Sequence, residues 1–280
     1  MRFVSEIFSL PDGHFTLLRD LIHDRIGVNY DKERRDLLAE KLTPRVIACG
    51  LDSFLDYYYF LKYDDAAEQE WKQVMDAISI QETFFWREMD QIRALVEVLV
   101  PEHFTAHPTE CLRIWSAACA SGEEPLTIAM ALDEKGWFAR APIEIYASDG
   151  SPSAIAKARQ GVYRDRSFRN LPPNLQTKYF REEQENQWRV IPELHNRIKW
   201  TTANLMAESE IQHLATANII FCRNVFIYFS EKAIFQTVRV FSKAMPTPGY
   251  LCVAASESLL KLTTEFELQE IENAFIYVKR

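Results

Sequence analysis

The sequence predicts an α/β domain built around a largely parallel sheet, preceded by an all-α N-terminal domain. Three observations predict it. Residues 1–78 carry apolar side chains at helical spacing only, whereas short apolar runs alternate with helical stretches from residue 111 onward. Strands that alternate with helices form βαβ units, with parallel strands and helices on both faces of the sheet. Residues 178–200 interrupt the alternation with short strand-like runs, which predict a small β insertion.

The N-terminal region predicts about four short helices that share a core. Gly27 follows the first apolar pattern and supplies a stop, and Pro44 is expected to end the second. Ser53 can begin a third helix, and apolar residues between Ala67 and Ile78 line one face of a fourth.

The sheet domain is expected at residues 111–280, after a linker and helix at 79–110. The final apolar run, 274–279, follows a loop and could join the sheet as an antiparallel strand at one edge. The other expected strands are 111–117, 143–148, 218–223 and 250–256, and the expected helices are 123–135, 151–160 and 230–244.

Composition restricts the classes of function. The net charge of −8 argues against broad nucleic-acid binding, because affinity for polyphosphate depends on cations. No apolar run approaches the ~20 residues that span a bilayer, and the N-terminus lacks a signal-peptide pattern. The five cysteines are scattered without a CxxC pair or a nearby histidine cluster. We therefore expect no metal site, no membrane insertion and a cytoplasmic location.

The stretch SAACASGEEP (116–125) follows the first expected strand and opens a helix. Dinucleotide loops need G-x-G-x-x-G, but this loop has one glycine, Gly122, followed by Glu123 and Glu124. Two carboxylates would repel a phosphate, so a cationic nucleoside without phosphate, S-adenosylmethionine (SAM), suits the loop better. Glu123 could accept a hydrogen bond from the ammonium group of SAM, and small residues such as Ala117 would let SAM lie close to the loop. The glutamates could equally be ordinary residues of a helix start.

Two further strand ends carry polar side chains. Asp149 ends the second expected strand, where an acid can accept hydrogen bonds from both ribose hydroxyls. It could also cap the helix that begins near Ser151. Arg223 and Asn224 end the third strand. Ligands of open α/β sheets bind at the carboxyl edge, so the sequence predicts one site there.

Five motifs occur in order along the chain: SIQETFFWRE (79–88), RIWSAACASGEEP (113–125), IYASDGS (145–151), ANL (203–205) and FCRNVFIYF (221–229). In this order and spacing they resemble the chemotaxis receptor glutamate O-methyltransferases, the CheR family, and the resemblance covers nearly the whole chain. It implies a Rossmann-like, SAM-dependent methyltransferase domain with a small antiparallel β insertion, preceded by a helical domain.

The resemblance also implies roles for individual residues. Tyr228 matches a tyrosine near the transferring methyl group, and the planar fork of Arg87 could hold a carboxylate of the cofactor or of the substrate, so both are candidate catalytic residues. Gln81 stands where asparagine is common, and Gly150 where an apolar residue is. Cofactor contacts are expected at Gln81, Thr83, Arg87, Glu123, Asp149, Asn204, Leu205, Arg223 and Asn224.

The implied reaction is direct displacement, in which a glutamate carboxylate oxygen attacks the sulfonium methyl group and S-adenosylhomocysteine (SAH) leaves. A carboxylate is already ionised at neutral pH, so no strong general base is required. Two alternatives stay open: a methyltransferase of this fold that modifies another protein or a small carboxylate, and a catalytically silent SAM-binding signalling scaffold. The missing glycines disfavour a nicotinamide dehydrogenase.

The resemblance implies the cytoplasmic domain of bacterial chemoreceptors as the partner. Within DKERRDLLAEKLTPR (31–45), Lys41 and Arg45 are the expected substrate contacts, although a solvated helix of mixed charge explains the stretch equally well. The stretch REEQENQWR (181–189) is shorter than in relatives that bind a tethering peptide, so we expect a monomer that works without a receptor tether.

Overall fold

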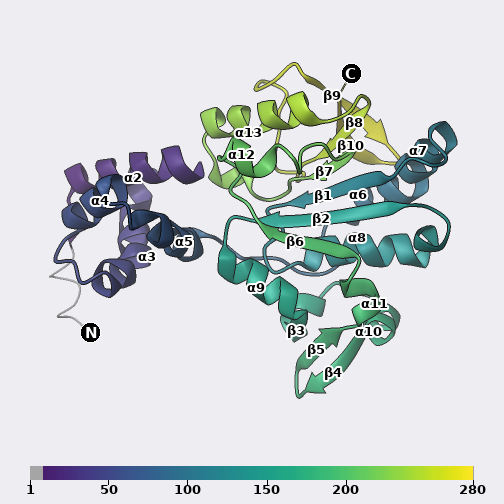
Figure 1. Ribbon diagram of the computed structural model, residues 1–280, viewed down its shortest axis with the longest axis horizontal. Coiled ribbons are helices and arrows are strands. Elements are labelled where there is room, and N and C mark those ends of the chain that lie inside the picture. Colours follow the sequence, from purple (N-terminus) through teal and green to yellow (C-terminus); the bar gives the residue numbers. More distant parts are fainter. Residues whose placement is uncertain (1–8, 280) are drawn as a thin grey trace.

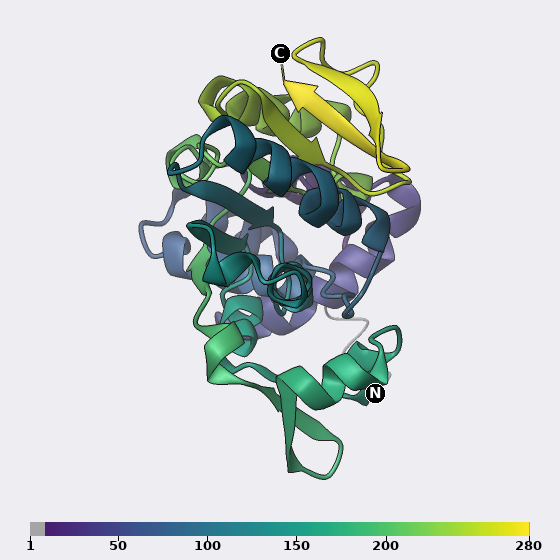
Figure 2. The same ribbon diagram turned by 90° about the vertical axis from the view of Figure 1, so that its right-hand side faces the viewer.

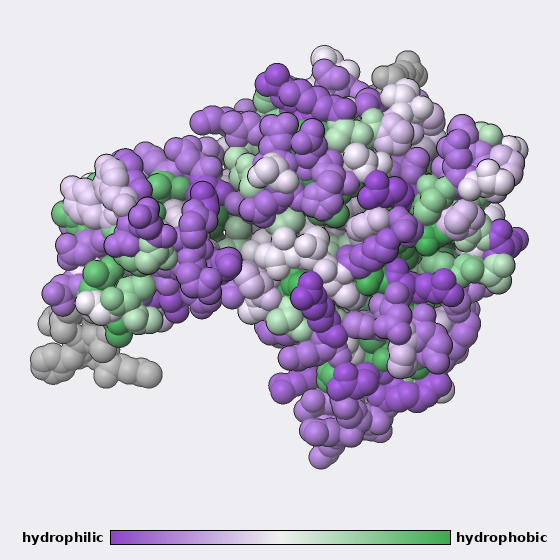
Figure 3. Space-filling model, viewed as in Figure 1, coloured by the Kyte–Doolittle hydropathy of each residue, from purple (hydrophilic) through white to green (hydrophobic). Residues whose placement is uncertain are grey.

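The computed structural model describes residues 9–279 and places a helical N-terminal domain beside a larger α/β domain (Figure 1). Both domains present a mainly hydrophilic surface in the view of Figure 3. No helix of the described chain combines the length and apolar character that a bilayer crossing needs. The helices of the N-terminal domain are α2 (Asp12–Ile26), η1 (Lys32–Arg34), α3 (Arg35–Ala48), α4 (Phe54–Tyr63) and α5 (Ala67–Ile78).

Local signals set most of these helix ends. Gly27 terminates α2 with φ 87°, a left-handed conformation that costs glycine little. The Ser53 side chain caps α4 by accepting from the Asp56 amide. The expected stop at Pro44 is wrong, because α3 continues to Ala48. Leu42 and Val46, on either side of the proline, are fully buried in the domain core, and this packing maintains the helix across it.

The larger domain contains a seven-stranded sheet in the order β6-β2-β1-β7-β8-β10-β9. Five strands are parallel, and β10 is antiparallel to both β8 and β9. The final apolar run, 274–279, forms β10 and pairs antiparallel as expected. It is not the edge strand, because β9 lies beyond it at the edge of the sheet. The strands are β1 (Leu112–Ala117), β2 (Ile143–Asp149), β6 (Ile198–Thr202), β7 (Ile219–Phe221), β8 (Gly249–Cys252), β9 (Phe266–Ile271) and β10 (Ala274–Lys279).

Alternation along the strands creates a core on each face of the sheet. In β1, Ile114 packs into the core shared with α8, whereas Trp115 packs into the core on the other face, against Phe241 of α13. These helices cover opposite faces of the sheet (Figure 1). The remaining helices are α6 (Met89–Ala94), the π-helical η2 (Leu95–Leu99), α7 (Val100–Ala106), α8 (Glu123–Glu134), η3 (Trp137–Ala139), α9 (Pro152–Gln160), α12 (Glu208–Ile211), η5 (Phe226–Tyr228) and α13 (Glu231–Ala244).

The β insertion differs from the expected residues 178–200. Its three-stranded antiparallel sheet already begins at Val162, and Ile198–Thr202 lies outside it, parallel to β2 in the main sheet. The helical turn Pro192–His195 separates that strand from the last strand of the insertion, so two strand-like runs close in sequence belong to different sheets. Figure 2 shows the insertion at the far end of the domain from β9 and β10. It comprises β3 (Val162–Arg164), η4 (Asp165–Phe168), α10 (Pro173–Tyr179), β4 (Phe180–Gln184), β5 (Gln187–Val190) and α11 (Pro192–His195).

Candidate active site

A cleft of about 1300 Å³, part of it open to solvent, lies between the two domains. One wall is the carboxyl edge of β1, β2, β6 and β7. The other is formed by α2, η1, α3 and α5, with the segments that follow α2 and α5. The structure brings ten of the thirteen predicted site residues to this cleft. They are Lys41, Gln81, Thr83, Arg87, Asp149, Asn204, Leu205, Arg223, Asn224 and Tyr228.

Asp149 ends β2 at the floor of the cleft. Its Oδ2 accepts from the Ala120 amide at 2.9 Å and its Oδ1 from the Ser151 amide at 2.8 Å. Burial raises the pKa of this carboxyl above its ordinary value. Asp149 does not cap α9, since the Ser151 side chain does so by accepting from Ala154. The two hydrogen bonds from backbone amides use about half of the acceptor sites of the carboxylate, and the remaining sites can bind a ligand.

The loop after β1 turns sharply without a glycine-rich sequence. Ala118 and Ala120 have φ values of 59° and 47°, in the left-handed region that side chains disfavour. Gly122 has φ 97°, and a Cβ there would lie 2.8 Å from a ring carbon of Trp200. The single glycine therefore serves close packing of the loop against β6, and the small side chains of Ala118 and Ala120 line the cleft. Ala117 is buried in the core beneath and does not line it, so its predicted contact is wrong.

Glu123 and Glu124 exchange the roles that the sequence predicts for them. The Glu123 side chain points away from the cleft, and its oxygens accept from Ser121 at 2.8 Å and Ser167 at 2.9 Å. The predicted cofactor contact at Glu123 is wrong because a helix rotates about 100° per residue and turns it toward the insertion. Glu124 lines the cleft instead.

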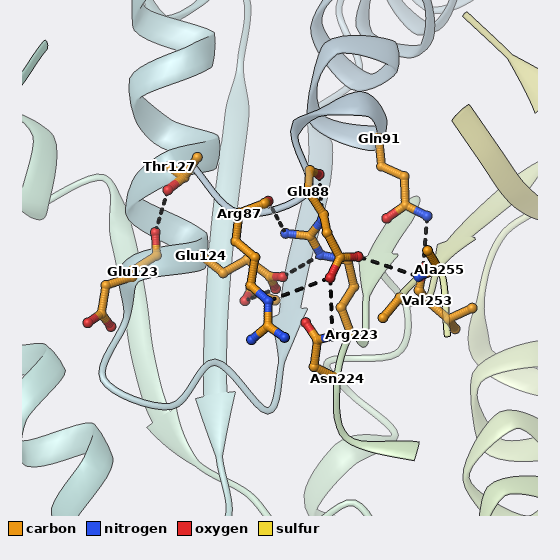
Figure 4. A network of polar contacts seen from close by, with 12 residues as sticks. Arg87, Glu88, Gln91, Glu123, Glu124, Thr127, Arg223, Asn224, Val253 and Ala255 are labelled. Atoms are coloured by element: carbon orange, nitrogen blue, oxygen red, sulfur yellow. Dashed lines mark hydrogen bonds and ion pairs between the residues drawn. The ribbon is translucent and has the colours of Figure 1, made fainter. Parts of the chain in front are cut away.

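Arg223 joins the third strand end to the linker. Its Nε lies 2.7 Å from Glu124 Oε2, and its terminal nitrogens donate to the backbone carbonyls of Glu88 and Arg87 (Figure 4). The Arg223 side chain is only 2% exposed. Burial lowers its pKa, but the charge and hydrogen bond of Glu124, together with the charge of Glu88, raise the pKa above its ordinary value. Ser116 donates to the other oxygen of Glu124, so this carboxylate is held on both sides.

Asn224 and Tyr228 lie on a loop that is fixed by buried Glu257. Glu257 accepts from the amides of Asn224, Ile227 and Ala254 at 3.0, 3.2 and 2.8 Å. Asn224 adopts φ 60°, and its side chain donates to Glu88 on the linker. Glu257 was not predicted, because it acts through backbone amides, two of which lie 33 and 30 residues earlier in the chain.

Arg87 projects its guanidinium into the open part of the cleft (Figure 4). It donates to the Glu82 carbonyl at 3.1 Å and lies over the Phe84 ring. Its Nε also lies 3.5 Å from Glu88 Oε1, and the remaining N–H groups leave the fork able to bind a carboxylate. Gln81 contacts Ser151 and accepts from Lys157 at 3.0 Å, so the long side chain at this position bridges to α9.

Only one of the two basic residues expected on α3 reaches the cleft. Lys41 lines it, donates to the Ala77 carbonyl at 3.2 Å, and has a pKa lowered by burial. Arg45 instead pairs with buried Glu70 at 2.6 Å within the N-terminal domain, so its predicted substrate contact is wrong. Arg34 belongs to the same basic stretch, 31–45, but was not preferred as a substrate contact, and it lines the cleft. It ends η1, directly before α3 begins.

Two hydrogen bonds that involve backbone groups of the N-terminal domain connect it to the predicted adenine and methyl ends of the cleft. Asn204 donates from its side chain to the Arg25 carbonyl at 2.7 Å, and the Asn29 amide donates to the Tyr228 carbonyl at 2.8 Å. Gly27 lies beneath Met206 and Phe229, and a Cβ there would approach both within 2.9 Å.

Both domains match the models of one protein family. Residues 13–79 match the CheR methyltransferase all-alpha domain, and residues 81–275 match the CheR methyltransferase SAM binding domain. The chain belongs to the CheR family. It is 31% identical to chemotaxis protein methyltransferase 2 of Vibrio cholerae, over 96% of this chain and 94% of that protein. It is also 31% identical to the chemotaxis protein methyltransferase of Salmonella typhimurium, over 95% of this chain and 91% of that protein.

This CheR protein is thus a methyltransferase with SAM as its cofactor, on a Rossmann-like domain as the sequence predicts. The cleft fits that cofactor chemically. The carboxylates of Asp149, at the end of β2, and of Glu124, in the first turn of α8, suit ribose hydroxyls and positive charge, whereas they would repel a phosphate.

Proposed function

We propose that this protein methylates glutamate side chains of chemoreceptors and forms glutamate methyl esters. The observation that carries the proposal is the cationic lining of the cleft opposite the strand ends. Arg34, Lys41 and Arg87 all line it, although the whole chain has a net charge of −8. Local cations in a negative protein favour an acidic substrate at that place. The names of the relatives, chemotaxis protein methyltransferases, support the choice of receptors.

Asp149, with Asn204 and Leu205, would hold the adenosine part of SAM, and Glu124 its ammonium end. Asp149 would accept from the ribose hydroxyls, and the Leu205 backbone would meet the adenine edge. Gln81 and Thr83 close the same cleft from the linker. The Asn204 side chain already contacts the Arg25 carbonyl and the Met206 amide, so we assign it an orienting role.

Bound SAM supplies an electrophilic methyl group on a sulfonium centre. Arg87 would bind the substrate carboxylate through two parallel hydrogen bonds and orient one oxygen toward that methyl group. Tyr228, on the loop held by Glu257, would limit access of water beside it. Arg223 acts indirectly, by holding Glu124 and the linker carbonyls in place.

Methyl transfer from labelled SAM to membranes that carry chemoreceptors tests the proposal. Label should enter the receptors and be released by mild base, because glutamate methyl esters hydrolyse readily. Base-stable label would exclude glutamate esters. Label confined to other proteins or to small carboxylates would favour the other methyltransferase function, and the absence of any transfer would favour the silent scaffold.

We further propose that the protein works in the cytoplasm as a monomer and without a receptor tether. A tight turn at Asn186, with φ 59°, joins β4 to β5, which leaves a short hairpin. Receptors truncated at their C-terminus should therefore be methylated with unchanged kcat/KM. A large loss of kcat/KM after truncation would contradict the tether-free proposal.

A further inference from the structure

The last turn of α5 contacts the loop between β2 and α9. This loop directly follows Asp149, the last residue of β2. Asp76 of α5 accepts at its Oδ1 from the Ser153 amide at 3.0 Å and from the Ser151 hydroxyl at 2.5 Å. Helix α9 therefore has two caps at its N-terminus, its own Ser151 and a carboxylate from the other domain. Negative charge is favourable at that end of a helix.

The Ser151 hydroxyl is saturated by these contacts. Its one proton goes to Asp76, and its oxygen accepts from the Ala154 amide and from Gln81 Nε2, both at 3.1 Å. The Ser151 amide donates to Asp149 Oδ1 at 2.8 Å. Ser151 thus connects the two carboxylates: its hydroxyl bonds Asp76 of the helical domain, and its amide bonds Asp149 at the floor of the cleft.

Packing fixes the same loop. A Cβ at Gly150 would lie 2.9 Å from Sδ and Cε of Met75, so the glycine allows α5 to approach closely. The charge of Asp76 adds to burial in raising the pKa of Asp149, which shows that the two carboxylates are electrostatically close.

We propose that Asp76 is a positioning residue for the cofactor: from the helical domain it holds Ser151 and thereby sets the orientation of Asp149. The proposal rests on the ribose role assigned to Asp149 above. Asp76 does not line the cleft, so it acts through Ser151 and not by contact. Cofactor affinity then depends on contact between the two domains, although the SAM binding domain holds most of the cleft.

The test compares Asp76→Ala and Asp76→Asn with the wild type in full-length protein, using SAH binding by calorimetry and steady-state kinetics. Asp76→Ala should raise the Kd for SAH and the KM for SAM about tenfold, the usual scale for loss of a helix cap, with kcat at saturating SAM unchanged. Asp76→Asn keeps the Oδ1 acceptor and should stay within about threefold of the wild type. Asp65→Ala removes an exposed acid before the start of the same helix and is the matched control.

Asp149→Ala and Ser151→Ala complete the design. Asp76→Ala combined with Ser151→Ala should cost less than the sum of the single effects, because both break one contact. If Asp149→Ala weakens SAH binding but Asp76→Ala does not, the positioning role is wrong and the ribose role stands. If Asp149→Ala leaves affinity unchanged, the ribose role fails and the inference with it. A loss of kcat with KM unchanged, or an equal loss in Asp76→Asn, would also overturn the inference.

Discussion

Glu123 and Glu124 are chain neighbours in opposite environments. Glu124 faces Arg223, whereas Glu123 is enclosed by two serine hydroxyls and carries the cost of burial. That burial raises the pKa of Glu123. A raised pKa means that the folded state prefers the protonated form, so the stability from Glu123 is present at low pH. It is lost as the pH rises past the unfolded value of about 4.3.

Glu123→Gln should consequently match the wild type in thermal midpoint near pH 4 and exceed it progressively toward neutral pH. The serine hydroxyls can rotate to accept from the new amide, so the hydrogen bonds are kept. Thermal unfolding followed from pH 4 to pH 8 measures the difference. A variant that loses stability relative to the wild type as the pH rises would contradict the assigned burial of a charge.

Arg45 and Lys41 differ at the residue scale in a way that mutation separates. Arg45→Met should destabilise the protein by about 2–3 kcal/mol, because it leaves Glu70 buried without its cationic partner, and should leave the receptor KM unchanged. Lys41→Met should give the converse, a raised receptor KM with little change in stability. Urea unfolding measures the stability of each variant, and kinetics at varied receptor concentration measure its KM. A raised KM in Arg45→Met alone would restore the substrate role of Arg45.

At the scale of elements, the loop that carries Asn224 and Tyr228 depends on Glu257. Glu257→Gln should cost about 2 kcal/mol, because an amide group would face backbone N–H donors that a carboxylate accepts. The same change should lower kcat, since the loop moves with its anchor. Exposed Glu265→Gln is the control. Urea unfolding measures the stability and steady-state kinetics measure kcat. Wild-type values for both would show that the loop keeps its conformation without Glu257.

Elements with strong local signals were predictable, and those set by distant partners were not. The apolar run around Trp115 and the cap at Ser53 identify their strand and helix from sequence alone. The strand Ile198–Thr202 was misassigned because nothing local reveals which sheet it joins. Site residues divide in the same way. Strand-end residues such as Asp149 were predictable, whereas the environments of Arg45 and Glu123 depend on Glu70 and Ser167, which lie more than twenty residues away in the chain.

At the scale of the whole molecule, the cleft exists only while the two domains are in contact. Beyond Asp76, His23 of α2 lies 2.6 Å from Ser230 at the start of α13, and Asn204 binds the Arg25 carbonyl. A ligand that fills the cleft contacts both domains and binds only their docked arrangement. Its binding energy should therefore stabilise the two domains together.

Scanning calorimetry with SAH tests that expectation. At about 100 times its Kd, SAH should add about 2.7 kcal/mol of stability and raise the midpoint of one shared transition by about 5–10 °C. Asp149→Ala at the same SAH concentration should show a much smaller shift, because little ligand would be bound. Two separate transitions, with only the later one moved by SAH, would mean that the helical domain unfolds independently and that the cofactor is held by the α/β domain alone.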